Sequence, residues 1–199
     1  MNLFKKIFGA ISEEDANEKV NPYQPEIATP LDEKFTFNFK NNGGKFLYCE
    51  DLNELREQFE NILEENDWFE SEVFCHDEKL FFLLDENKLP YKDVKNPKFF
   101  FTVCEDLISD DGSILFSSKQ FKQFKANELL SDMIVFATTS QIVGNKSDGL
   151  RNIKKRYDKE YPSNITTIKY FERTQKEEED FLHYGSSHKN LYLLLLEDL

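Results

Sequence analysis

Apolar residues in this chain gather into short runs separated by polar segments with helical spacing. Runs at residues 45–49 (KFLYC), 72–75, 99–103 (FFFTV) and 133–138 (MIVFAT) are rich in β-branched and aromatic residues and indicate strands. After Asp51, apolar residues recur on one side of a helix at positions 52, 55, 59, 62 and 63. This alternation of strands and helices predicts an α/β fold with a mostly parallel sheet between helices.

Two helix starts carry clear capping signals. Asp51 can cap the first helix, with Glu54 at the capping-box position. Asp77 can cap a second helix that carries apolar residues at positions 80, 81 and 84. Residues 32–40 are more ambiguous, since phenylalanines at positions 35, 37 and 39 have the period of a strand while the charged flanks suit a helix. We expect a strand there and keep the helix as the alternative.

The second half of the chain continues the same pattern. Residues 119–127 form a helical turn or a loop, and Asn145 or Ser147 caps a helix that buries residues 150, 153 and 157 and turns its basic residues 151 and 154–156 to solvent. Residues 164–170 indicate a strand and residues 175–183 a charged helix. The run at 191–196 (LYLLLL) is apolar on both faces, which places this last strand inside the sheet.

A polar segment, residues 105–112, separates the apolar strand 99–103 from a second β-rich run at 114–116. It holds four acids at positions 105, 106, 110 and 111, and Gly112 and Ser113 close it. In α/β folds such strand ends carry ligands, although ordinary solvated turns have the same composition. Glu105 is the weak candidate for a catalytic base, and other catalytic residues are unknown from sequence.

Composition narrows the classes of protein. The 199 residues fit one domain, and 39% hydrophobic residues, with 20 phenylalanines, predict a folded core. We expect residues 1–30, which contain three prolines between positions 22 and 30, to be a tail or linker, and residues 31–199 to be the domain. A short amphipathic helix near the N-terminus is the alternative for part of that tail. The net charge of −13 argues against nucleic acid as a partner.

The sequence also lacks the common cofactor and metal motifs. No Walker loop, dinucleotide fingerprint, nucleophile elbow or zinc-protease motif occurs, and the three histidines have no partners at metal-ligand spacing, so we expect no metal and no cofactor. Cys49, Cys75 and Cys104 are widely spaced and indicate buried thiols in the cytoplasm. No apolar run reaches the length of a membrane span. A homo-oligomer stays open.

The second half of the chain resembles the LUD domain family, the lactate-utilisation proteins of bacteria. The family follows a strand with an acid and then a Thr-Gly-Thr or Thr-Gly-Ser turn, and CEDLISDDGSILFSS matches this with Glu105, Gly112 and Ser113, while Asp111 replaces the threonine. Near the C-terminus, Arg173 and Thr174 match the family's Gly-Pro-Ser-Arg-Thr motif, but a Tyr-Phe-Glu sequence replaces its first three residues. The closing strand is also similar.

The resemblance implies a three-layer α/β/α sandwich like that of the NagB, ribose-5-phosphate isomerase and CoA-transferase group. It implies ligand binding by Gly112, Ser113, Arg173 and Thr174, with Arg173 recognising an anion. It also implies an accessory or ligand-binding protein of lactate or related organic-acid metabolism, with iron–sulphur partner subunits supplying any redox centre. The alternatives are an isomerase or transferase that acts on a small anionic substrate through Glu105, and a degenerate interaction module.

Overall fold

The computed structural model describes residues 29–122, 124–125, 128–171 and 189–199. Its centre is a five-stranded sheet in which every neighbouring pair is parallel. In spatial order the strands are β1 (Lys45–Cys49), β9 (Asn190–Leu196), β6 (Asp132–Thr138), β3 (Phe99–Val103) and β2 (Val73–Cys75). This confirms the predicted α/β fold with a mostly parallel central sheet, and the last strand lies inside the sheet as its sequence indicated.

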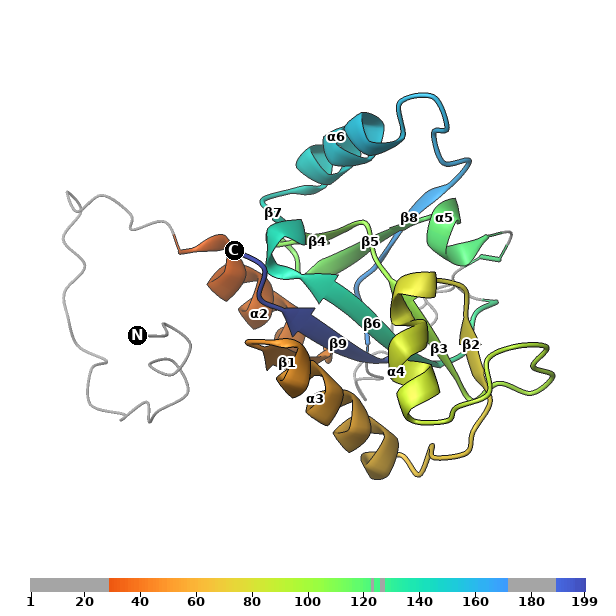
Figure 1. The fold of residues 1–199 in the computed structure, drawn as a ribbon. Coiled ribbons are helices and arrows are strands. Elements are labelled where there is room, and N and C mark those ends of the chain that lie inside the picture. The colour runs from red at the N-terminus through yellow and green to blue at the C-terminus, as the bar shows by residue number, and fades with distance from the viewer. Residues whose placement is uncertain (1–28, 123, 126–127, 172–188) are drawn as a thin grey trace, which may run out of the picture.

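One face of the central sheet is covered by helices (Figure 1). They are α3 (Leu52–Glu65), the 3₁₀ helix η1 (Glu78–Leu80) and α4 (Phe81–Glu86). Asp51 caps α3 by accepting hydrogen bonds from the backbone amides of Asn53 and Glu54, as predicted. The apolar side of α3 buries Phe59, whose ring stacks on Phe101 of β3 with centroids 5.0 Å apart.

The opposite face packs against helix α2 (Leu31–Asn41) and a second sheet. That sheet has the order β7 (Ile142–Val143), β4 (Asp106–Ile108), β5 (Ser113–Ser117), β8 (Ile165–Ile168). The short helix α5 (Ser118–Phe121) follows β5. Helix α6 (Lys146–Tyr157) lies on the outer side of the second sheet (Figure 1), where Ile153 packs against Ile108 and Leu115.

Two of the predicted elements are wrong. Residues 32–40 lie in helix α2, because burial at positions 35 and 39, one helical turn apart, outweighs the alternation: those two rings stack 5.4 Å apart while Phe37 is 67% exposed. The polar segment 105–112 is not a solvated loop, since it contains the buried strand β4, which pairs antiparallel with β5. Leu150, expected in the core, is 42% exposed.

Some expectations stay predictions. The helix expected at residues 175–183 and most of the tail expected at residues 1–30 lie outside the described residues.

The three cysteines are buried free thiols, as their sequence context indicated. No helix within the described ranges is long and apolar enough to span a membrane.

Candidate ligand-binding site

A cavity of about 740 Å³ lies at the carboxyl ends of the parallel strands β2, β3 and β6. After β2 the chain packs Leu80 and Leu83 into the core on the α3 and α4 face, whereas after β3 it packs Leu107 and Ile114 into the core on the opposite face. Neighbouring strand ends whose connections leave to opposite faces open a crevice, which is where α/β sheets bind ligands. The volume suits a small-molecule ligand.

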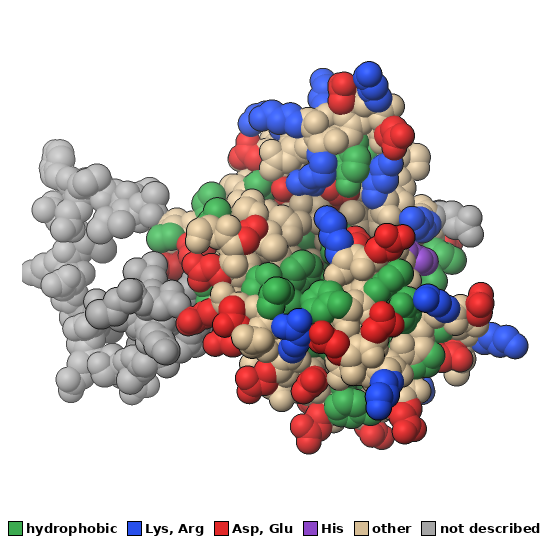
Figure 2. All heavy atoms as spheres, viewed as in Figure 1, with side chains coloured by type: hydrophobic (Ala, Val, Ile, Leu, Met, Phe, Trp, Pro, Cys, Tyr) green, Lys and Arg blue, Asp and Glu red, His purple; other side chains and the backbone are tan. Residues whose placement is uncertain are grey.

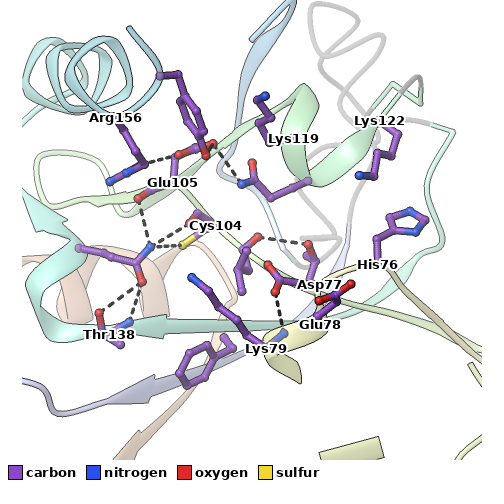
Figure 3. A pocket seen from close by; sticks show the side chains of 16 residues that line it. His76, Asp77, Glu78, Lys79, Cys104, Glu105, Lys119, Lys122, Thr138 and Arg156 are labelled. Atoms are coloured by element: carbon purple, nitrogen blue, oxygen red, sulfur yellow. Dashed lines mark hydrogen bonds and ion pairs between the residues drawn. The ribbon is translucent and has the colours of Figure 1, made fainter. Parts of the chain in front are cut away.

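Four cationic side chains from three separate segments line this cavity. Lys79 belongs to η1 and Lys119 to α5. Lys122 directly follows α5, and Arg156 lies in the last turn of α6. Figure 3 shows these side chains arranged around the same space. Asp77, Glu78 and Glu105 also line the cavity.

The four cations differ in how far they are already paired. Arg156 forms an ion pair with Glu105, and the Lys119 amino group lies 3.3 Å from the carboxylate of Glu160 at the surface. Within the part of the chain that the structure describes, the amino groups of Lys79 and Lys122 have no ion-pair partner. These two lysines are therefore available to an incoming anion.

Lys122 has an unusual backbone conformation. It follows α5 with φ 54° and ψ −119°, a region that residues with a side chain rarely adopt. Such strain costs on the order of 1–3 kcal/mol and is concentrated at functional positions. The conformation lies directly beside the cavity, in a residue whose side chain lines it.

His76 follows β2 and lines the cavity near Lys122 (Figure 3). Its ring packs edge-on against Phe74, with centroids 4.4 Å apart, and against Phe100. Partial burial, and then the positive charge of Lys122, lower the pKa of His76 below its usual value. At neutral pH the imidazole is consequently neutral and can both donate and accept a hydrogen bond.

Glu105 lies at the end of β3 with only 1% of its surface exposed. One carboxylate oxygen accepts hydrogen bonds from Ser117 (2.6 Å), Gln120 (3.0 Å) and the Tyr157 hydroxyl (3.0 Å), and the other accepts from Arg156. These hydrogen bonds connect the end of β5, α5 and α6 to the link between β3 and β4, where Glu105 lies. Because both carboxylate oxygens are buried and already accept hydrogen bonds from neighbouring side chains, the carboxylate is poorly placed to contact a substrate.

Asp106 is equally buried, on the side that faces α6. Its Oδ1 accepts from Asn152 at 3.1 Å and lies 3.7 Å from the Arg156 guanidinium, while its Oδ2 has no hydrogen-bond partner among the described residues. Burial is the main cause that raises the pKa of Asp106 to about 6, and the neighbouring Glu105 adds to it. Asp106 therefore gains or loses a proton in mildly acidic solution.

Replacing Asp106 with asparagine is expected to change how stability depends on pH. Because the pKa of Asp106 is about 6 in the folded chain and 3.8 as an ordinary aspartate, the folded state binds the extra proton, and the stability it provides is lost as pH rises from about 4 through 6. The wild-type free energy of unfolding should thus fall relative to Asp106→Asn by about 2–3 kcal/mol between pH 4 and pH 7. Urea unfolding at each pH measures this, and parallel profiles of the two proteins would contradict it.

The sequence-predicted ligand residues Gly112 and Ser113 do not line this cavity. They lie at the opposite end of the β4–β5 hairpin, where Gly112 has φ +66° and packs against the backbone of Asn38 and Phe39 in α2. The Ser113 hydroxyl donates to Asp111 at 2.6 Å. Their role in ligand binding stays a prediction, and Arg173 and Thr174 lie outside the described residues. Of the three candidates that the structure describes, Glu105 lies in the cavity wall and Gly112 and Ser113 do not.

Sequence reasoning missed the cavity cations. Arg156 was assigned to the solvent-facing side of its helix, yet its guanidinium reaches back to Glu105 with its side chain 40% exposed. Lys79, Lys119 and Lys122 carried one usable signal, since each follows shortly after a predicted strand. Among the described residues, no group of three histidine, cysteine or acidic side chains is arranged to hold a metal ion.

No protein-family model matches the sequence, and no curated protein matches it significantly. Among solved structures, the fold is similar to the crystal structure of a DUF162 family protein from Deinococcus radiodurans. The two share a TM-score of 0.60 and 12% sequence identity, over 84% of this chain and 96% of that chain. At this identity the similarity establishes the fold alone.

Proposed function

We propose that this chain is a binding protein for a small anion, held in the cavity by Lys79 and Lys122 with Lys119 beside them. The observation that carries the proposal is the convergence of these cations on one hollow at the carboxyl ends of β2 and β3, where Lys79 and Lys122 have no ion-pair partner among the residues that the structure describes. The whole chain is strongly acidic, with a net charge of −13, whereas the cavity is lined by four cationic side chains and three carboxylates. A basic hollow in an acidic protein attracts anions to that place and repels them from the remaining surface.

The class of anion follows from the family proposal. DUF162 is the family now known as the LUD domain, so the structural neighbour supports the view that this chain is a divergent LUD-like protein. We therefore take lactate, or a related organic acid, as the first ligand to test, with inorganic phosphate as the alternative head group. A role beside iron–sulphur partner subunits is part of the same proposal.

The geometry favours binding over catalysis. The isomerase or transferase alternative needs Glu105 as a base or nucleophile, and that carboxylate is buried and already accepts four hydrogen bonds. A base must be within reach of the proton that it removes and free to accept it. In this structure Glu105 supports the wall of the cavity.

Thermal unfolding with added ligand tests the proposal. Lactate or phosphate at about 100 times its dissociation constant should stabilise the folded protein by roughly 2.7 kcal/mol, which raises Tm by about 5–10 °C. The double variant Lys79→Ala/Lys122→Ala should lose most of this increase, because it removes the two lysine charges proposed to hold the anion. Lys154→Ala, on the exposed side of α6, is the matched control and should behave like the wild type. An increase of equal size in the double variant would refute the assignment.

Replacing Lys122 with glycine is expected to separate stability from binding. Glycine adopts φ 54° without strain, so the variant should gain on the order of 1 kcal/mol in the free energy of unfolding. It also lacks one of the cations, so the increase in Tm on adding anion should shrink. Denaturant unfolding and the ligand-dependent Tm measure the two effects. A variant less stable than the wild type would contradict the strain argument.

A further inference from the structure

The cavity continues into an apolar strip on the α3 and α4 face of the central sheet. Val103 and Phe136 line the cavity, lie side by side on β3 and β6, and are only partly buried. Leu196 on β9 pairs in register with Thr138, two residues beyond Phe136, and is also partly buried. Adjacent strands are about 4.8 Å apart, so the strip extends roughly 10 Å across three strands from the cavity.

The side chains of this strip are only partly buried: Val103, Phe136 and Leu196 pack against the core and keep intermediate exposure. On this face helix α3 contacts β1 and β9, while α4 lies toward the β3 and β2 edge, and Figure 1 draws the carboxyl ends of β6 and β9 between the two helices. Figure 2 shows hydrophobic side chains gathered at this place in the middle of the face, with charged side chains around them. Leu52, the first residue of α3, is a further exposed apolar side chain, at 49%.

We propose that the ligand of this cavity is an amphipathic anion, with a carboxylate or phosphate head group at Lys79 and Lys122 and a hydrocarbon chain along Val103, Phe136 and Leu196. The inference rests on the proposed function, because the same lysines hold the head group. A purely hydrophilic anion such as lactate would use the cations and leave the strip in water. An acyl chain buries it and gains the free energy of removing apolar surface from water.

Charge and continuity favour this occupant over a docked protein. The strip begins inside the cavity wall, at two residues that also line the hollow, so one molecule of modest size contacts both parts. The neighbouring charges are of both signs, with Asp77 and Glu78 near Lys79, and an anionic head group is held on the lysine side. A second copy of the chain at this face is the competing occupant and is an outcome of the test.

Calorimetric titration of the full chain with acetate, butyrate, hexanoate and octanoate tests the inference. Affinity should rise about two- to fourfold for each added methylene until the chain passes the strip. Phe136→Ser should reduce this dependence on chain length while acetate still binds. Leu196→Gln should shorten the range of chain lengths over which affinity rises. Phe37→Ser changes an exposed phenylalanine that does not line the cavity and should retain the wild-type series.

The outcomes separate the inference from the function it deepens. Equal affinity for acetate and octanoate overturns the amphipathic ligand but leaves an anion site. If the protein binds none of the four fatty acids, the amphipathic ligand is wrong. If it also binds neither phosphate nor lactate, the proposed function is wrong as well. Analytical sedimentation tests the competing occupant. If the protein is a dimer that Phe136→Ser dissociates and octanoate does not, the strip serves self-association and the inference is overturned.

Discussion

Replacing Arg156 with methionine is expected to lower the free energy of unfolding by about 3–5 kcal/mol, because the Glu105 carboxylate stays buried without its cation. The loss is far larger than that of a surface ion pair, since Glu105 is only 1% exposed. For a domain of this size it corresponds to a decrease in Tm of about 10 °C. Urea unfolding at neutral pH measures the change.

A double-variant cycle separates the charge from the packing. Glu105→Gln/Arg156→Met replaces both partners with neutral groups of similar shape, so it should recover most of the stability that Arg156→Met loses. Lys154→Met changes an exposed residue of α6 two positions before Arg156 and should leave stability almost unchanged. If Arg156→Met unfolds at the wild-type urea concentration, the pair does not support the cavity wall and the account of Glu105 is wrong.

Replacing Gly112 with alanine is expected to cost more than about 3 kcal/mol. The residue has φ +66°, and an added Cβ would lie 2.4 Å from the backbone carbonyl carbon of Asn38 and from the amide nitrogen of Phe39. Neither backbone atom can move aside as the end of a side chain can. Glycine is therefore required at position 112 because the β4–β5 turn packs closely against α2.

Gly144→Ala provides the matched control, since its added Cβ would meet its nearest neighbour at 3.6 Å and its φ is not in the positive range. We expect that variant to unfold within about 0.5 kcal/mol of the wild type. Thermal and urea unfolding of both variants decide the question. A Gly112→Ala protein of wild-type stability that no longer binds anion would instead restore the ligand-binding role that the sequence suggested.

The central sheet could be predicted because each of its strands is a short apolar run that is visible in the local sequence. The run at 191–196 is apolar on both faces, and only an interior strand buries both faces. Asp51 marks the start of α3 through a hydrogen bond to a residue two positions away. Local spacing predicts the wrong element for α2. The spacing of Phe35, Phe37 and Phe39 fits a strand, and it is the packing of the first and third in the core between the two sheets that selects the helix.

The site was less accessible from sequence because tertiary contacts create it. Glu105 and Arg156 are 51 positions apart, and the local sequence around neither residue indicates that they form an ion pair. The segment 105–112 looks solvated by composition, yet its first two carboxylates are buried by α6, which arrives from residues 146–157. The resemblance to a turn motif drew attention to Gly112 and Ser113, which lie at the other end of the same hairpin.

An NMR titration of the backbone amides with inorganic phosphate, lactate and octanoate, against chloride as the control, tests the anion site most directly. Saturating anion should shift the amides of residues 76–79 after β2, 103–105 after β3 and 118–122 around α5, because these segments surround the cavity. Shifts confined to Gly112 and Ser113, or no shift beyond that of chloride with any of the three anions, would contradict this prediction.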